Sequence, residues 1–267
     1  MRLDRVLRQK AHSGVRLVRA VIRSARDDGF RDAGHMLNGV LHGFLPSNKK
    51  RADRKNAFDL KYGTDTSGIV RVASMEISSP NYVYAAYYKA STSEHVHGAL
   101  QSLPVGPESF TFVDFGSGKG LALMVASLYP FRNIVGVEFA ADLHRIAIAN
   151  LEKFRPAERK CTKVESVHAD ATQWPVPADP LICYFYEPFD KPILSKVINR
   201  LEASYGEAKR PILILYHQPP TTSVLRTDSM LKEQVVLKNG IFRKIDNWKH
   251  EPYVLYAASA TSEAAVA

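Results

Sequence analysis

The feature that most constrains this chain is a set of three glycines at every second position, directly after an apolar run. The run covers residues 110–115 and includes one acidic residue, Asp114, and the glycines lie within residues 116–120. An apolar pattern of helical period follows over residues 121–128. This order predicts a buried strand, a tight turn and a helix N-terminus, where missing side chains let the backbone approach a ligand closely.

Strands and helices alternate after this point. Segments of strand length occur at residues 110–115, 133–138, 164–168, 181–186 and 211–216, and all except 164–168 are mainly apolar. Helical patterns lie before and between them, at residues 94–103, 121–128, 141–154 and 192–205. The tail contains two more candidate strands without a clear helix between them, near residues 234–237 and 253–256. We therefore predict an α/β fold with a mostly parallel, Rossmann-like sheet and helices on both faces.

The positive charge of the chain is concentrated near its N-terminus. Residues 1–61 contain 15 Lys and Arg against 6 Asp and Glu, which accounts for the whole formal net charge of +9. Residues 3–25 are predicted to form an arginine-rich amphipathic helix, and residues 27–45 a second helix. The first helix packs on the main domain, lies on a membrane surface, meets an acidic partner or acts as an organelle transit signal. Because the remaining residues have balanced charge, we expect no DNA-binding groove across the main domain.

Three regions are expected along the 267 residues. They are a basic helical region with a linker (1–57), a lid or cap segment (58–104) and the main domain (105–267). Residues 58–68 combine an aromatic pair, two glycines and several short polar side chains in one loop. This loop is either a plain turn or a lid over a pocket.

The chain has two cysteines, Cys161 and Cys183, whose spacing fits neither a metal site nor a redox motif. We therefore expect a reduced, cytoplasmic protein without a metal site. No apolar run reaches the roughly 20 residues that a membrane helix needs.

Five successive predicted strands end on a polar side chain that can take part in chemistry. In chain order these residues are Asp114, Glu138, Asp170, Glu187 and His217. The carboxyl ends of parallel strands meet at one edge of a sheet, where ligands bind. We therefore expect the five side chains to surround one ligand site.

The spacing of the glycine loop differs from the dinucleotide fingerprint G-x-G-x-x-G. Its third glycine is Gly120, one position early, and Leu121 occupies the fingerprint position. The Asp114 carboxylate beside the loop would repel a pyrophosphate but suits an ammonium group. A nicotinamide-dependent oxidoreductase is therefore disfavoured.

The next two strand ends point to a different ligand. Glu138 follows Gly118 by 20 residues and is placed to accept hydrogen bonds from both hydroxyls of a ribose. Asp170 could accept a hydrogen bond from the amino group of an adenine. A ligand that combines a ribose, an adenine and an amino-acid ammonium is S-adenosylmethionine.

These motifs resemble those of the class I S-adenosylmethionine-dependent methyltransferases, over residues 105–258. The likeness rests on D-x-G-x-G-x-G at residues 114–120 and on the acids after the second and third strands. It implies a seven-stranded sheet with a final antiparallel pair. An F-D-x-x-[FY]-G-x-D-T segment at residues 58–66 is similar to that of one little-described bacterial subgroup and favours the lid. The predicted cofactor-binding residues are Asp114, Gly116, Ser117, Gly118, Gly120, Glu138, Asp170, Ala171, Thr64 and Thr66.

The fourth strand end is expected to carry the chemistry. Its Glu187-Pro188-Phe189 run is closer to the E-P-F type of lysine-methylating relatives than to the N/D-P-P-Y/F motif of many nitrogen methyltransferases. Glu187 could orient an ammonium group and favour its loss of a proton. Tyr186 either lines the acceptor pocket or only packs in the core, and His217 is either a base near neutral pH or a structural histidine.

The leading hypothesis is a methyltransferase that acts on a nitrogen of a protein lysine or of a small molecule by in-line transfer. One alternative is an RNA methyltransferase that uses the basic N-terminal arm. Another is a non-catalytic protein of the same fold that binds a partner or a membrane through its N-terminal helices.

Overall fold

A computed structural model describes residues 55–79, 81, 88–189, 191–217, 242–244 and 253–258. The two predicted N-terminal helices and the predicted strand at residues 234–237 lie outside these residues. None of the helices in the described part of the chain is both long and apolar enough to cross a membrane.

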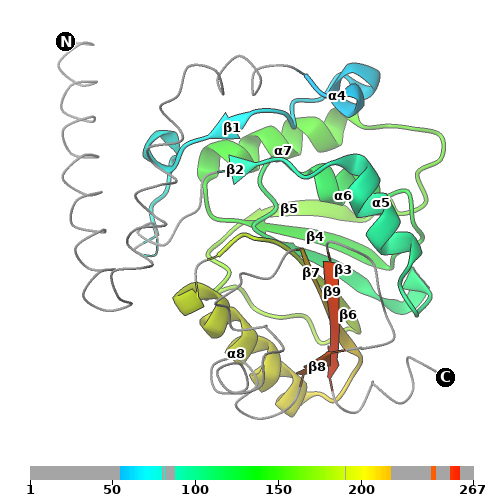
Figure 1. Ribbon diagram of the computed structural model, residues 1–267, viewed down its shortest axis with the longest axis vertical. Helices are drawn as coiled ribbons and strands as arrows, with labels where there is room; N and C mark the ends of the chain where they lie inside the picture. Colours follow the sequence, from blue (N-terminus) through cyan, green and yellow to red (C-terminus); the bar gives the residue numbers. More distant parts are fainter. Residues whose placement is uncertain are drawn as a thin grey trace.

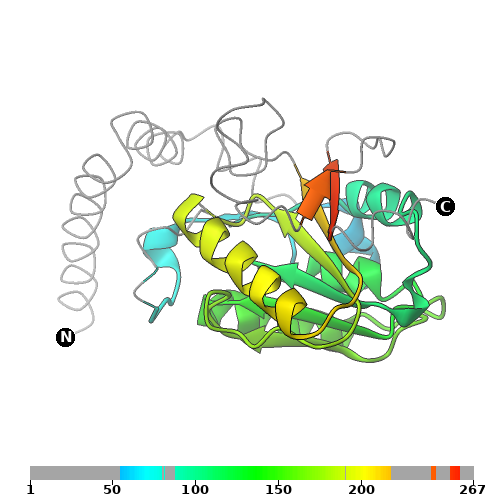
Figure 2. The same ribbon diagram turned by 90° about the horizontal axis from the view of Figure 1, so that it is seen from below.

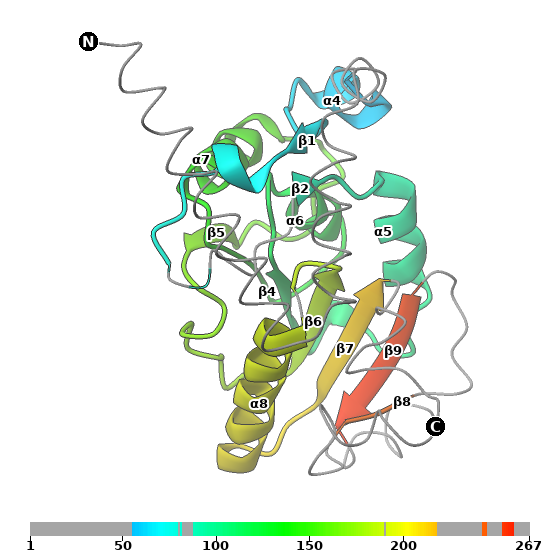
Figure 3. The same cartoon turned by 60° about the vertical axis from the view of Figure 1, so that its left-hand side comes forward.

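The main sheet has the strand order β5-β4-β3-β6-β7-β9-β8 (Figure 1). Its strands are β3 (Thr111–Phe115), β4 (Asn133–Glu138), β5 (Val164–His168), β6 (Leu181–Tyr186), β7 (Ile212–His217), β8 (Phe242–Lys244) and β9 (Tyr253–Ala258). The first five strands in this spatial order are mutually parallel. β9 runs antiparallel to β7, and β8 antiparallel to β9 (Figure 3). The prediction of a mostly parallel α/β sheet is therefore confirmed.

Helices flank this sheet, and a small second sheet lies beside it. The α-helices are α4 (Ala57–Tyr62), α5 (Ser93–Gln101), α6 (Leu121–Ala126), α7 (Ala141–Lys153) and α8 (Lys191–Glu207). The short 3-10 helices are η1 (Val72–Ser74) and η3 (Pro107–Ser109), and the small sheet pairs β1 (Ile69–Val70) with β2 (Tyr88–Lys89). α4, β1 and β2 lie at the same end of the molecule as α7 (Figures 1 and 3).

The sheet separates two apolar cores. One core contains Phe112 of β3 together with residues of α5 and α6 and Phe154 after α7. The other contains Phe115 of β3 and the apolar side of α8, including Leu194. The two phenylalanines of β3 belong to different cores because side chains alternate along a strand. Figure 2 shows α8 lying across one face of the sheet.

The predicted single loop over residues 58–68 is wrong in its first half, which forms α4. The side chain of Asn56 caps this helix by accepting a hydrogen bond from the Asp59 N–H at 2.7 Å. Gly63 ends it in the left-handed conformation, with φ of 69°. A six-residue helix has too few turns to show an apolar period, so the sequence pattern did not reveal it.

The carboxylate of Asp59 organises the loop that follows α4. Its Oδ1 accepts hydrogen bonds from the Thr64 hydroxyl at 2.7 Å and from the Thr66 N–H and hydroxyl at 2.8 and 2.9 Å. Its Oδ2 accepts from the N–H and hydroxyl of Ser67 at 2.8 and 2.5 Å. Burial opposes ionisation of Asp59, but these hydrogen bonds outweigh it and hold the pKa below its ordinary value.

The 55–70 segment is fixed to the main domain on two sides. Phe58 stacks on Phe154 with ring centroids 5.4 Å apart. Asn150 of α7 accepts the Asp65 N–H at 2.8 Å and donates to the Asp65 carbonyl at 2.9 Å. A second donor contact of the same amide reaches the carbonyl of Lys119 in the glycine loop at 2.9 Å. The segment before the sheet is therefore built onto the glycine loop.

Replacing Asp59 with asparagine should destabilise the protein. An amide nitrogen would face donors that now bind a carboxylate oxygen, and one hydrogen bond to a charged group contributes about 1.5–3 kcal/mol. We expect the free energy of unfolding at pH 7 to fall by about this amount in Asp59→Asn. Urea denaturation followed by circular dichroism measures the change.

The pH dependence provides a second readout for the same variant. Because the folded-state pKa of Asp59 is depressed, its contribution is present above the unfolded value of about 3.9 and is lost as pH falls through the folded pKa. Asp59→Asn should lack this acid-induced loss. Glu158→Gln, a carboxylate-to-amide change on the exposed surface, is the control. Equal acid sensitivity of the wild type and Asp59→Asn would contradict the assigned role.

Candidate functional site

The three glycines after β3 all adopt backbone conformations that other residues avoid. Their φ angles are 81° at Gly116, 52° at Gly118 and 83° at Gly120. A Cβ on Gly116 would lie 2.6 Å from the Cβ of Pro188, and a Cβ on Gly118 would lie 2.3 Å from the Tyr88 ring. The loop therefore touches both the Glu-Pro-Phe turn after β6 and the segment before the sheet.

The backbone N–H groups of the loop are already used within the protein. Gly116 and Ser117 both donate to the Val137 carbonyl, at 2.9 and 3.2 Å. Gly118 donates to the Oε2 atom of Glu138 at 2.7 Å, and the last glycine of the loop donates to the Ser117 carbonyl at 2.9 Å. A phosphate would need such N–H groups free, so these four do not form a phosphate cradle.

Two buried carboxyl groups lie at this loop. Asp114 and Glu138 are only 4% and 3% exposed. Burial raises the pKa of Glu138 to about 7, although the N–H groups of Ala140 and Gly118 bind its carboxylate. Burial, and then the neighbouring Glu138, raise the pKa of Asp114 well above its ordinary value. Such a pair favours a ligand that brings positive charge and hydrogen-bond donors.

Ser117, which was predicted to contact the cofactor, packs its side chain against β4 and so supports the loop. Its side chain fills the space above Gly136 of β4, where an added Cβ would lie 2.6 Å from the Ser117 hydroxyl oxygen. This hydroxyl is buried and has no hydrogen-bond partner in the described part of the chain. Since its N–H is bound to Val137, the groups with which Ser117 could hold a ligand both face the protein.

Thr64 and Thr66 were predicted to contact a cofactor from the lid. Both are buried, and both hydroxyls donate to Asp59. The Thr66 hydroxyl also accepts from the side-chain amide of Asn56 at 3.1 Å. The side chains of the two threonines thus hold the shape of the loop.

The third strand end lines a small pocket together with the loop. Asp170 and Ala171 border it with Gly116, and Pro188 and Phe189 close it from the turn after β6. Predicted residues from two strand ends, those of β3 and β5, therefore share one pocket. Asn81, from the segment before the sheet, also lines it.

Tyr88 and Lys119 were not predicted as site residues, but both join the glycine loop to the segment before the sheet. The buried Tyr88 hydroxyl donates to the Thr66 carbonyl at 2.6 Å, with its ring over Gly118. The Lys119 ammonium donates hydrogen bonds to the Asp65 Oδ1 atom and to the Ser67 carbonyl, both at 2.8 Å. The sequence gives only a weak signal for Tyr88, because residues 88–91 fit a Y-x-P-[ST] pattern poorly, with Ala90 in place of the proline.

The predicted catalytic residues meet at the ends of β6 and β7. Tyr186 lies opposite His217 in the strand register, and their rings stack at 4.1 Å. The Oε1 atom of Glu187 lies 3.4 Å from Nδ1 of the buried His217. His95 of α5 has its ring 6.3 Å from that of His217. Glu187 has a φ of 48°, the only positive value at a non-glycine residue in the described part of the chain.

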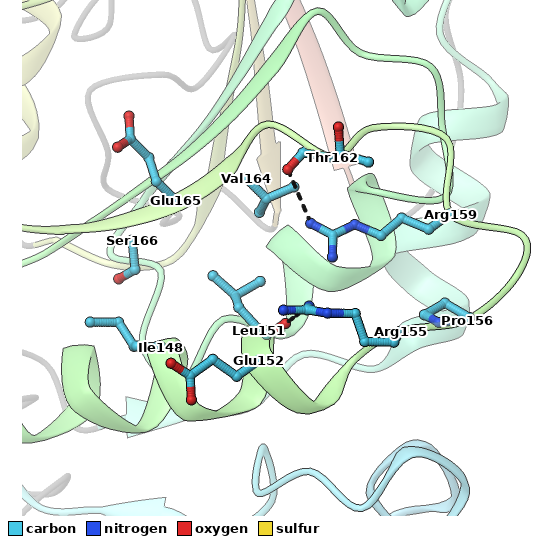
Figure 4. A pocket seen from close by; sticks show the side chains of 10 residues that line it. All are labelled: Ile148, Leu151, Glu152, Arg155, Pro156, Arg159, Thr162, Val164, Glu165 and Ser166. Atoms are coloured by element: carbon cyan, nitrogen blue, oxygen red, sulfur yellow. Dashed lines mark hydrogen bonds between the residues drawn. The ribbon is translucent and has the colours of Figure 1, made fainter.

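A larger groove lies away from these strand ends, between α7 and β5 (Figure 4). Its two arginines bind backbone carbonyls: Arg155 those of Leu151 and Phe154, and Arg159 those of Phe154 and Cys161. Both guanidinium groups therefore cap the end of α7. None of the predicted site residues lines this groove.

The raised pKa of Glu138 predicts how stability changes with pH. The folded protein keeps this proton up to about pH 7, whereas the unfolded chain releases it at about 4.3. The free energy of unfolding should therefore lose a contribution as pH rises from about 4.5 to 7. Glu138→Gln should lose less stability over this interval. Urea denaturation at several pH values measures the slopes.

Glu165→Gln, an exposed carboxylate-to-amide change on β5, is the matched control. Its slope should equal that of the wild type. The same slope in Glu138→Gln would show that Glu138 titrates normally and would contradict the description of a buried carboxyl pair.

Comparisons with protein-family models and with curated proteins give no match. Among solved structures, the chain is similar to an S-adenosylmethionine-dependent methyltransferase from Aquifex aeolicus, with 16% identity over 61% of this chain and 88% of that chain and a TM-score of 0.42. It is also similar to a ribosomal protein L11 methylase from Lactobacillus delbrueckii subsp. bulgaricus (14% identity, 63% and 78% covered, TM-score 0.42). A third similar structure is a putative methyltransferase from Escherichia coli (15% identity, 69% and 97% covered, TM-score 0.45). At these values the chemistry of the chain has to come from its own residues.

Proposed function

We propose that this chain is an S-adenosylmethionine-dependent methyltransferase that transfers a methyl group to a nitrogen atom. The observation that carries the proposal is the buried pair Asp114 and Glu138 beside a glycine loop whose N–H groups are already used. The pair disfavours an anionic ligand and favours a ligand with a cation and hydroxyl donors. S-adenosylmethionine has both, in its ammonium, its sulfonium and its ribose.

Different residues of the loop region would bind different groups of the cofactor. Asp114 would accept from the ammonium, and Glu138 would accept from the ribose hydroxyls with the lone pairs that Gly118 and Ala140 leave unused. Lys119 does not neutralise these carboxylates with its ammonium, which is bound to Asp65. The bound cofactor supplies a methyl group on a sulfonium sulfur, which is already electrophilic.

The turn that contains Glu187 supports the proposal that a nitrogen atom accepts the methyl group. Its half-exposed carboxylate suits an ammonium, and the stacked Tyr186 and His217 form a flat, partly apolar wall beside it. A positive φ at a residue with a side chain costs of order 1–3 kcal/mol, and such strain clusters at functional sites. The contact between Gly116 and Pro188 brings this turn close to the glycine loop.

The side chains of the turn would act by binding, orienting and taking up a proton. Glu187 would hold the amine and accept its proton, directly or through water, and His217 lies 3.4 Å away as a further acceptor. Correct orientation of an acceptor can contribute up to roughly 7–11 kcal/mol in ideal cases. We also propose that the basic N-terminal region binds an acidic partner or a membrane surface.

The cofactor site is tested by equilibrium binding. Asp114→Asn and Glu138→Gln each replace a carboxyl group that can ionise when the ligand binds by a neutral amide of the same shape, and this loss should weaken binding of S-adenosylmethionine roughly 10- to 100-fold. Isothermal titration calorimetry on the full chain measures it, with Glu165→Gln as the unchanged control. Undiminished binding in both site variants would reject the assignment.

The acceptor chemistry is tested by transfer. The protein is incubated with methyl-labelled S-adenosylmethionine in a lysate that lacks it, and the labelled fraction is hydrolysed to identify the methylated atom. We expect label on nitrogen, and a rate reduced roughly 10²- to 10⁴-fold in Glu187→Gln with cofactor binding unchanged. Glu108→Gln, at another exposed glutamate, is the control. Label in RNA would favour the RNA alternative, and label on oxygen or carbon would overturn the nitrogen assignment.

A further inference from the structure

We propose that Asn81, a residue outside the glycine motif and the strand ends, reads the amino group of the cofactor's purine ring in place of Asp170. The inference rests on the proposed function, since it concerns the base of the same ligand. It comes from the hydrogen bonds around the pocket that Asn81, Asp170 and Ala171 line with Gly116 and Phe189.

The carboxylate of Asp170 has no acceptor capacity left for a ligand. Its Oδ1 accepts the N–H and the hydroxyl of Thr172 at 2.8 and 2.7 Å. Its Oδ2 accepts the hydroxyl of Ser79 at 2.5 Å and the side-chain amide of Asn81 at 2.8 Å. A carboxylate has about four lone-pair sites, and these four bonds occupy them. An adenine amino group would have to displace one of these donors.

The same contacts fix which end of the Asn81 amide is available. The Thr172 hydroxyl gives its single proton to Asp170, so its oxygen acts as an acceptor toward Asn81 at 3.2 Å. The Nδ2 atom of Asn81 therefore donates its two protons to Asp170 and Thr172. The remaining polar atom is Oδ1, to which no donor is bound in the part of the chain that the structure describes. The Asn81 backbone is held as well, since its N–H donates to the Ser79 hydroxyl at 3.1 Å.

The rest of this small pocket carries few polar groups. Its other walls are largely apolar and are formed by Val137, Phe139, Ala171, Pro188, Phe189 and Ile193. In such a pocket an acceptor oxygen from Asn81 selects a ring that carries an amino group. A purine with a keto oxygen at that position would set two acceptors against each other, which leaves buried polar atoms unpaired. Asp170 is then a positioning residue that orients the amide.

Two nucleoside ligands that differ only at this position test the inference. S-adenosylhomocysteine has an amino group, and S-inosylhomocysteine has a keto oxygen. Binding of each to the full chain is measured by calorimetry, and the ratio of the two affinities is the readout. We expect the wild type to prefer the adenosyl ligand by roughly tenfold or more. The ratio should fall close to one in Asn81→Ala, and Thr172→Val should lower it because the amide loses an anchor.

Controls separate this role from general damage to the site. Gln101→Ala removes an exposed carboxamide at the end of α5, away from this pocket, and should keep the wild-type ratio. A wild-type ratio in Asn81→Ala, with loss of preference only in Asp170→Asn, would show that Asp170 reads the base and would overturn the inference. If the wild type binds neither ligand, the proposed cofactor is itself wrong and the inference is rejected with it. Thermal unfolding of each variant shows whether it is folded.

Discussion

The site depends on one buried carboxylate, that of Glu138. It accepts the Gly118 N–H at 2.7 Å and the Ala140 N–H at 2.8 Å, so a single side chain joins the loop after β3 to the beginning of α7. Its ionisation is opposed by burial, which raises its pKa to about 7. A ligand that donates hydrogen bonds or carries a positive charge offsets this penalty. The residue that holds the loop in shape is thus also the one that makes a cationic, hydroxyl-bearing ligand favourable.

A second carboxylate, that of Asp59, sets the shape of the segment before the sheet. By accepting the donors of the following loop, it brings Asp65 within 2.8 Å of Lys119 and leaves the Thr66 carbonyl for Tyr88. The Tyr88 ring then covers the middle glycine of the loop. This segment, which precedes the sheet in sequence, is consequently part of the wall around the strand ends. The proposed site is therefore built from the strand ends and from the segment that precedes the sheet.

Most of the parallel strands were predictable because β3, β4, β6 and β7 are short, mainly apolar runs. The bounds of β4, β5 and β6 coincide with the predicted residues, and those of β3 and β7 differ by one. α4 was missed because its six residues begin at a side-chain cap and end at a left-handed glycine, without an apolar period. β8 was missed since three residues carry no pattern, and it is defined only by pairing with β9.

The sequence by itself determined the glycine spacing and the acids at the strand ends, because positive φ angles and the positions of strand ends are local properties of the chain. Only the tertiary structure decided which of these groups still have free hydrogen-bonding capacity. Asp170 looks like a ligand acceptor in the sequence, yet Ser79 and Asn81, about 90 residues earlier, occupy its Oδ2 atom. Likewise, the hydroxyls of Thr64 and Thr66 are taken up by Asp59. The saturation of a polar group depends on neighbours that only folding brings within 3 Å of it.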